Sequence, residues 1–134
     1  MIFLPKEFII QINRDMISRY GGSFFGNDNL NNPGSLDWVL EAIQYPIFGA
    51  DQYPVLAQKT AILSWIINEG HVFYDGNKRT STMSAMLFLI ANGHALEATP
   101  RELIEIAESI AMCKTSGFTF KEYVAWIKER LREI

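Results

Sequence analysis

Apolar residues recur at intervals of three and four along most of this chain, which is the spacing of amphipathic helices. Before the last third of the chain, the pattern predicts helices over residues 5–20, 35–45, 54–69 and 78–92. The fourth of these segments is apolar enough to be expected buried nearly all round. Alternating strand patterns are almost absent, so we expect an all-α fold, a compact helical bundle with at most one small hairpin.

Local signals place several helix ends. Ser35 is a good N-cap for the second helix, and Pro46 closes that helix. The last two helices begin at capping boxes, each a hydroxyl followed three residues later by a carboxylate: Thr99 with Glu102, and Thr119 with Glu122. The terminal run, residues 128–134, is expected to be a solvated helix face.

Two segments between the helices have the composition of turns. Residues 23–34 are rich in Asn, Gly and Asp, whose side chains compete with regular backbone pairing. A mobile surface loop is expected there. Residues 47–53, IFGADQY, carry Gly49 near their middle, which indicates a hairpin or an extended flap.

The composition narrows the class of protein. The 134 residues are 49% hydrophobic and contain no long linker, so we expect one domain over residues 1–134. Twelve basic and 15 acidic residues give a net charge of −3, which offers no global reason to bind nucleic acid or a membrane surface. The single cysteine, Cys113, is expected to be buried and inert, as in a reducing compartment. The N-terminus does not resemble a signal peptide, and no apolar run approaches ~20 residues, so a soluble, cytoplasmic protein is expected.

Between two of the most apolar helices, residues 70–79, GHVFYDGNKR, place His, Asp, Asn, Lys and Arg within nine residues. The start of the following helix offers free backbone N–H groups and a positive dipole end, which bind phosphate readily. Gly76 allows close backbone approach or a positive φ, and Lys78 and Arg79 add positive charge. The stretch therefore predicts an anion site, although its glycine spacing is not that of a P-loop.

His71 and Asp75 supply the other two parts that phosphoryl-type transfer needs. An imidazole titrates near neutral pH and can accept a proton from an attacking hydroxyl, while a carboxylate can hold a Mg²⁺ that bridges phosphate oxygens. Taken singly, each residue has a plainer interpretation: a capping or core histidine, an Asp-Gly turn, or a solvated first turn with Lys78 and Arg79. Their coincidence in one loop favours the phosphate site.

The segment HVFYDGNKRTST, residues 71–82, resembles the active-site motif of Fic/Doc proteins, His-x-Phe-x-Asp/Glu-Gly-Asn-Gly/Lys-Arg. Residues 34–48, 53–63 and 86–96 also resemble the segments around that motif in the Doc, or death-on-curing, branch. The resemblance covers residues 34–96 well and the two ends loosely.

The resemblance implies a helical fold whose central helix-loop-helix forms a nucleotide site. It implies that His71 is the general base, Phe73 the core anchor of the loop, and Asp75 the Mg²⁺ ligand. The phosphates of ATP would be held by Gly76, Asn77, Lys78 and Arg79. The family's flap, which holds the target peptide by strand-like pairing, corresponds to Ile47, Phe48, Gly49, Ala50, Asp51, Gln52 and Tyr53.

Two positions depart from the pattern of nucleotidyl-transferring Fic enzymes. Those enzymes typically have Gly at the position of Lys78 and a second Arg at the position of Thr82. The arrangement here is that of the Doc branch, which implies a reversed ATP that delivers its γ-phosphate to a Ser/Thr hydroxyl. Such a toxin kinase halts translation by modifying elongation factor Tu. Two alternatives stay open: nucleotidyl transfer (AMPylation) to a protein hydroxyl, and a non-catalytic module that binds an anion or nucleotide.

The resemblance also has implications for how the activity of the protein is inhibited. Many Fic enzymes inhibit themselves through a Ser/Thr-x-x-x-Glu helix, but no Ser or Thr here is followed by Glu four residues later. We therefore expect an antitoxin polypeptide that inserts a helix into an apolar groove, placed near the first helix and residues 23–34. Trp38, Trp65 and Trp126 are candidates for that groove or for the core. His94 is expected at the surface after its helix and not as a second base.

Overall fold

The computed structural model describes residues 1–134 and contains seven helices and one two-stranded sheet. The helices are α1 (Lys6–Tyr20), α2 (Pro33–Gln44), α3 (Leu56–Glu69), α4 (Asn77–Ala91), α5 (Pro100–Ala111), α6 (Cys113–Ser116) and α7 (Phe120–Arg130). Strands β1 (His94–Leu96) and β2 (Leu131–Glu133) pair antiparallel, with Ala95 opposite Arg132. The predicted all-α class is confirmed.

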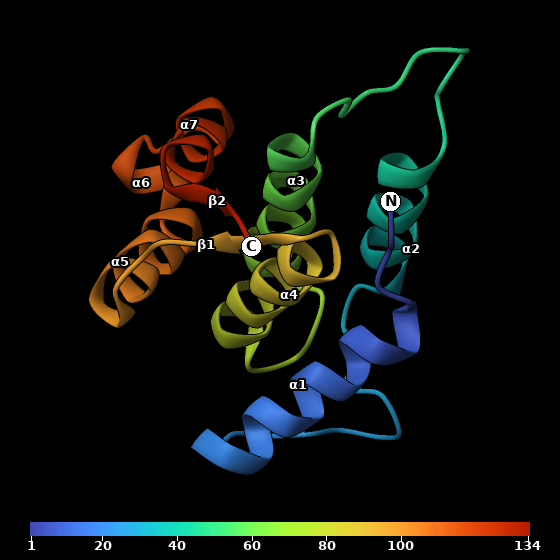
Figure 1. Ribbon diagram of the computed structural model, residues 1–134. Helices are drawn as coiled ribbons and strands as arrows, with labels where there is room; N and C mark the ends of the chain where they lie inside the picture. The colour runs from blue at the N-terminus through green and yellow to red at the C-terminus, as the bar shows by residue number, and fades with distance from the viewer.

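Helix α3 is the centre of the fold. It contacts α2, α4, α5 and α7, and Figure 1 shows these helices arranged around it, with α1 on the far side of α4. One core cluster joins the first four helices through side chains such as Leu36, Leu63 and Phe88, and a second joins α3, α5 and α7. The loop between α3 and α4 is therefore fixed at both ends by packed helices. None of the helices combines the length and the hydropathy that a membrane crossing needs.

Two helices differ from their predicted form. Helix α2 begins at Pro33, before the expected N-cap Ser35, because the fixed φ of proline suits the first helical position. Helix α4 is not buried all round, since Ile90 is 51% exposed while Ser81 and Ser84 face the interior. Its neighbours α1, α3 and α5 leave part of its apolar surface uncovered.

The C-terminal run is also not the solvated helix face that was expected. Helix α7 ends at Arg130, and the next three residues form β2. The neighbouring β1 offers backbone partners at this point: the Glu97 N–H donates to the Arg130 carbonyl (2.8 Å), and the Ile134 N–H donates to the Gly93 carbonyl (3.0 Å). The two strands were missed because each has only three residues, too few for an alternating pattern to stand out.

Several single residues also have surroundings different from those predicted. His94 begins β1 and is half-buried, and Cys113 is half-buried at the start of α6 rather than in the core. Trp65 and Trp126 pack against the second core cluster, whereas Trp38 on α2 is 46% exposed.

Both predicted capping boxes are present. At the start of α5, Thr99 Oγ1 accepts a hydrogen bond from the Glu102 N–H, and Glu102 Oε1 accepts one from the Thr99 N–H, both at 3.1 Å. This backbone hydrogen bond from Thr99, followed by the one from Arg130 (3.1 Å), holds the pKa of the Glu102 carboxyl below its ordinary value. Glu102 is therefore a pH-dependent contributor to stability.

Replacing Glu102 with glutamine is expected to reduce the loss of stability in acid. Because its folded-state pKa is lowered, the carboxylate stabilises the fold above the unfolded-state pKa, and that contribution is lost as the pH falls through the folded-state pKa. Urea unfolding at about pH 7 and about pH 3 measures the effect. Glu105→Gln, an exposed carboxylate on the same helix, should keep the wild-type difference. An equal acid loss in Glu102→Gln and wild type would contradict this role.

Candidate active site

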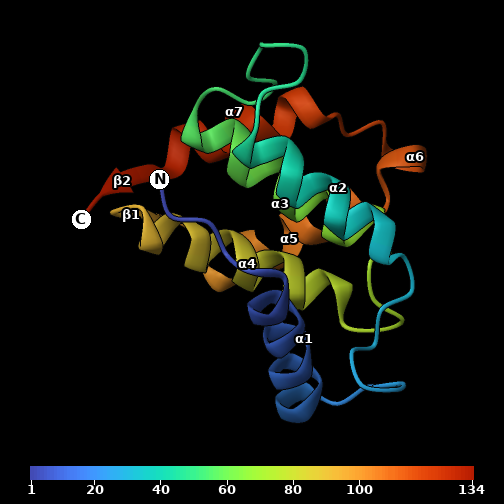
Figure 2. The same ribbon diagram turned by 90° about the vertical axis from the view of Figure 1, so that its right-hand side faces the viewer.

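The motif loop, residues 70–76, connects α3 to α4 and lies beside the segment that precedes α2 (Figure 2). Backbone pairing joins the two segments: Leu30 and Phe73 form an isolated antiparallel bridge, and the Tyr74 N–H donates to the Asn29 carbonyl at 3.0 Å. Of the predicted loop, residues 23–34, the last two belong to α2, and residues 23–32 form a loop. These contacts hold its second half in place, so it is not a freely mobile surface loop. Its asparagines form one wall of the site.

Phe73 and Asn77 hold the shape of the motif loop. Phe73 is fully buried in the first core cluster. The Asn77 side chain accepts a hydrogen bond from the Phe73 N–H (2.9 Å) and donates one to the Phe73 carbonyl (2.8 Å). The side-chain amide of Asn77 thus fastens the loop to the first turn of α4. Because this amide is occupied, Asn77 could contact an anion through its backbone N–H.

His71 is held in an uncommon backbone conformation. Its φ is +47°, a left-handed value that costs a non-glycine residue about 1–2 kcal/mol. Its carbonyl accepts hydrogen bonds from the side-chain amides of Asn31 (3.2 Å) and Asn32 (3.1 Å), which offset this cost. The imidazole is exposed and makes no hydrogen bond within the protein, so both ring nitrogens are available to a substrate.

A buried amide network fixes the loop from the side of α1. Asn13 and Asn29 are both fully buried, and the Asn29 amide donates to the Asn13 side-chain oxygen at 2.9 Å. The Asn13 amide in turn donates to the Asp75 carbonyl (2.9 Å) and to the Thr80 hydroxyl (3.0 Å). A Cβ on Gly76, whose φ is +78°, would lie 3.0 Å from this Asn13 nitrogen, so glycine is required for the close packing of α1.

Asp75 presents its carboxylate to the backbone of the segment after α1. Oδ2 accepts from the Ser23 N–H and Oδ1 accepts from the Gly76 N–H, both at 2.9 Å. A carboxylate has about four lone-pair positions, so each oxygen keeps room for one more partner. The exposed Asp75 is therefore compatible with a Mg²⁺ ligand, and its direction is fixed by two amides.

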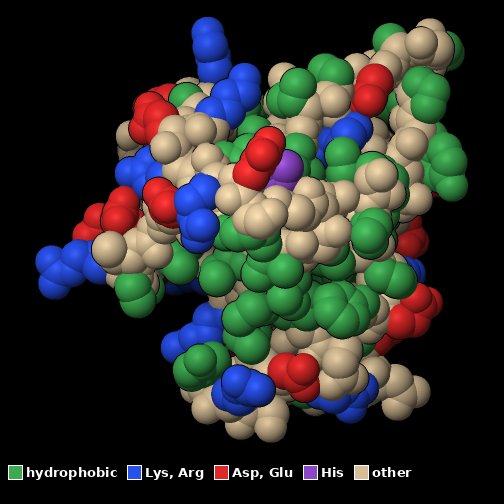
Figure 3. Space-filling view, in the orientation of Figure 1, with side chains coloured by type: hydrophobic (Ala, Val, Ile, Leu, Met, Phe, Trp, Pro, Cys, Tyr) green, Lys and Arg blue, Asp and Glu red, His purple; other side chains and the backbone are tan.

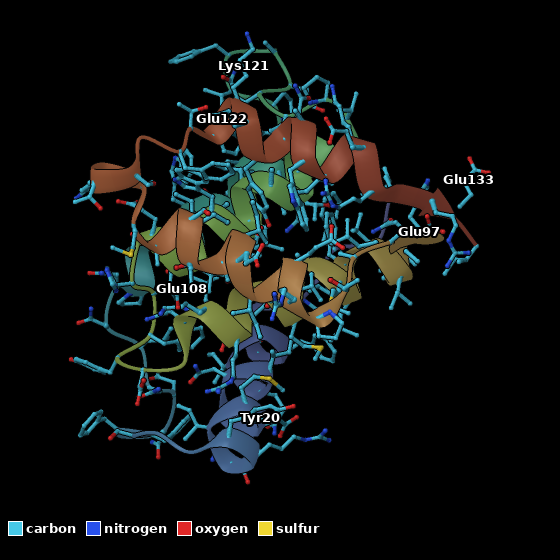
Figure 4. The ribbon with its side chains drawn as sticks, turned by 90° about the vertical axis from the view of Figure 1, so that its left-hand side faces the viewer. Tyr20, Glu97, Glu108, Lys121, Glu122 and Glu133 are labelled. Atoms are coloured by element: carbon cyan, nitrogen blue, oxygen red, sulfur yellow. The ribbon has the colours of Figure 1, made fainter.

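Positive potential is concentrated at the start of α4. The N–H groups of Asn77, Lys78 and Arg79 have no acceptor within the protein, as expected for the first turn of a helix. Lys78 pairs with Glu108 of α5 at 2.7 Å, and the Arg79 guanidinium lies 4.7 Å from the centre of the Tyr20 ring. Figure 4 shows Glu108 on α5 and Tyr20 at the end of α1, with α4 between the two helices.

Both cations can serve a bound anion. The Lys78–Glu108 pair has both side chains about half exposed, and such a pair contributes only about 0–1 kcal/mol, so phosphate can replace the carboxylate. The Arg79 guanidinium lies over the Tyr20 ring and donates to no acceptor within the protein, so its N–H groups are free for an anion. Lys78, Arg79 and the free N–H groups therefore lie together at the place where the sequence predicts an anion site.

The predicted flap residues form a tight turn between α2 and α3. Ile47 and Ala50 exchange backbone hydrogen bonds at 2.9 and 3.0 Å, and the two residues between them, Phe48 and Gly49, have φ values of +49° and +77°. Positive φ at both central positions is typical of the type I′ turns that close hairpins. Phe48 is fully exposed at the tip.

Sequence reasoning missed the residues that support the motif loop: Asn13, Asn29, Asn31 and Asn32. Only one signal pointed to them. Asn13 interrupts the apolar face of α1 between Ile12 and Met16, and a buried polar residue there has to find a partner. The partners themselves lie more than 15 positions away and follow no local pattern.

Comparison with known proteins agrees with this geometry. A family model described as the Fic/DOC family matches residues 3–89, which include the motif loop. Over 88 residues the chain is 34% identical to a protein named Toxin Doc from Mycolicibacterium smegmatis, covering 65% of this chain and 68% of the relative. Over 111 residues it is 30% identical to a protein named Protein kinase doc from Escherichia phage P1, covering 83% of each.

Proposed function

Because this chain belongs to the Fic/DOC family, we propose that it is a Doc-type toxin that transfers the γ-phosphate of ATP to a Ser/Thr hydroxyl of a protein. One observation carries the proposal: an exposed, unbonded imidazole lies on the same short loop as a carboxylate and a helix start with three free N–H groups. The names of the two relatives, a toxin and a protein kinase, support it. Elongation factor Tu is the target that we propose, from the resemblance to the Doc branch.

The residues have the following roles in this reaction. The N–H groups at the start of α4, with Lys78 and Arg79, bind the phosphates, and Asp75 would hold Mg²⁺, which offsets phosphate charge when bound. His71 accepts the proton of the target hydroxyl while the hydroxyl oxygen bonds to the γ-phosphorus. The bond from that phosphorus to the β,γ-bridging oxygen breaks, and ADP leaves with the electron pair. The imidazolium then returns its proton to solvent.

The choice of phosphoryl over nucleotidyl transfer rests on Lys78 and Thr82. Nucleotidyl-transferring Fic enzymes have glycine and a second arginine at these positions. The Thr82 hydroxyl donates to the Lys78 carbonyl at 3.0 Å, inside the helix, and it offers no charge to the outer phosphates of ATP. Lys78 instead adds an ammonium at the beginning of α4, which favours the Doc arrangement.

ATP labelled at either end tests the proposal. Purified protein is incubated with elongation factor Tu and Mg²⁺, and the mass of the target is measured in parallel. Transfer of the γ-label, with the mass of one phosphate added, is the expected result. Transfer of the α-label, with the mass of one nucleotide monophosphate, would identify an AMPylating enzyme. No transfer, with ATP still bound, would identify a binding module.

The position of Asp75 gives a prediction with a matched control. Gly22→Ala is expected to weaken MgATP binding about tenfold or more, because its Cβ would lie 2.7 Å from Asp75 Oδ2 and displace the carboxylate. Gly21 also has a positive φ, +88° compared with +130° at Gly22, but a Cβ at Gly21 would meet nothing within 4 Å, so Gly21→Ala is the matched control. Calorimetric titration of ATP with and without Mg²⁺ should therefore separate the two variants. Equal affinities would show that the Asp75 carboxylate does not hold the metal.

An antitoxin polypeptide forms the second part of the proposal. A groove of about 270 Å³ runs between α1 and α4, and its apolar wall is made of Phe8, Ile12, Met16, Met83 and Leu87. Figure 3 shows hydrophobic side chains gathered over α4 and toward α1. An amphipathic helix would bury its apolar face there. This groove includes the first helix of the placement predicted from the sequence, whereas residues 23–34 do not line it.

A further inference from the structure

Lys59 is a lysine with almost no access to solvent. It lies on α3, and only 6% of it is exposed. Its ammonium donates to the Ile43 carbonyl of α2 (3.0 Å) and to both carboxylate oxygens of Asp51 (3.3 and 3.2 Å). An isolated buried charge is costly, so these partners are what make the position tolerable. Lys59 lies outside the family motif and has no role in the reaction described above.

Asp51 is the flap residue that the Lys59 ammonium contacts. At the end of the flap, Tyr53 packs against the first core cluster and the Phe120 ring. The rest of the flap is lightly attached: Figure 1 shows it extending beyond the ends of α2 and α3, and residues 47–52 are all exposed. Asp51 Oδ1 also accepts the Tyr53 N–H at 3.1 Å, which shapes the return leg toward α3. The Lys59–Asp51 pair is therefore the charged contact that fixes the direction of the flap.

We propose that Lys59 is a positioning residue for the protein substrate: it holds Asp51 and keeps the flap in the orientation that accepts the target peptide. This inference rests on the proposed function, in which the flap binds the target. A flap released from α3 has to be ordered when the target binds. The free-energy cost of this ordering weakens target binding. His71 and the beginning of α4 lie on another loop, so proton transfer and ATP binding do not depend on the pair.

Two variants test the inference from either side of the pair. Lys59→Met keeps the length of the side chain and removes the charge. Asp51→Asn removes the opposite charge of the pair from its exposed side and retains an oxygen for the Tyr53 N–H. Both should raise KM for elongation factor Tu roughly tenfold, with kcat and KM for ATP near wild-type values. Glu97→Gln, which breaks an exposed pair with Arg132 (2.7 Å) far from the flap, should leave all three unchanged.

Chymotrypsin cleavage after the fully exposed Phe48 gives a readout that needs no target. Cleavage should be faster in both variants than in wild type and Glu97→Gln, at a temperature well below every Tm. Faster cleavage with an unchanged KM would overturn the role in target binding, and unchanged cleavage would overturn the anchoring itself. A lowered Tm without a rise in KM would indicate a merely structural role, which also overturns the inference. If the wild type transfers no phosphate, the proposed function fails, and the cleavage rates still decide whether the pair anchors the flap.

Discussion

Replacing His71 with alanine is expected to lower kcat by about two to four orders of magnitude, the usual contribution of a general base. ATP binding should survive, because the phosphates are held by the start of α4 and not by the imidazole. Phosphate transfer to elongation factor Tu measures the first quantity, and calorimetric titration of ATP measures the second. Growth inhibition in cells should disappear in parallel.

Two further variants isolate the imidazole as the cause. His71→Asn should lose as much activity, although asparagine tolerates the left-handed backbone found at this position. His94→Ala removes the other imidazole of the chain, whose Nδ1 lies 2.8 Å from the Asn92 carbonyl oxygen, and should keep wild-type activity. Full growth inhibition by His71→Ala would exclude a general base and favour a protein that acts by binding alone.

Replacing Phe73 with alanine is expected to lower the free energy of unfolding by about 3–5 kcal/mol. The ring is fully buried between α1, α2, α3 and α4, where a truncated side chain leaves a cavity. Because small domains are stable by only about 5–15 kcal/mol, this one change removes a large part of the total. Urea unfolding followed by circular dichroism measures it.

The matched control is Phe48→Ala, the same truncation at a fully exposed ring. Its free energy of unfolding should stay within about 0.5 kcal/mol of wild type, as for most surface substitutions. A similar loss in both variants would mean that burial of Phe73 is not what anchors the loop. A small loss in both would mean that the surrounding helices collapse into the space.

The sequence was most informative where structure depends on near neighbours. Both capping boxes lie three residues apart in the chain, and both are present at the starts of α5 and α7. The all-α class follows from a periodicity spread over whole helices. The family motif also identified the loop between α3 and α4, where a free imidazole and the helix start are now found together.

The remaining features depend on partners that are distant in the chain. The hydroxyls of Ser81 and Ser84 gave no sign that this side of α4 would face the interior. The amides of Asn31 and Asn32 reach the His71 carbonyl across about 40 positions, and a composition rich in asparagine indicates only a loop. Lys59 has no signal in the local sequence and becomes informative only when its burial is known.

The buried amides of Asn13 and Asn29 have a consequence for how the protein is made. During synthesis Asn13 leaves the ribosome before Asp75 and Thr80, so its hydrogen bonds to them cannot form until residues 75–80 emerge, and a chain stalled before α4 has no finished site. The motif loop therefore takes its final shape late in translation, when the N-terminal third of the chain packs against the newly released motif.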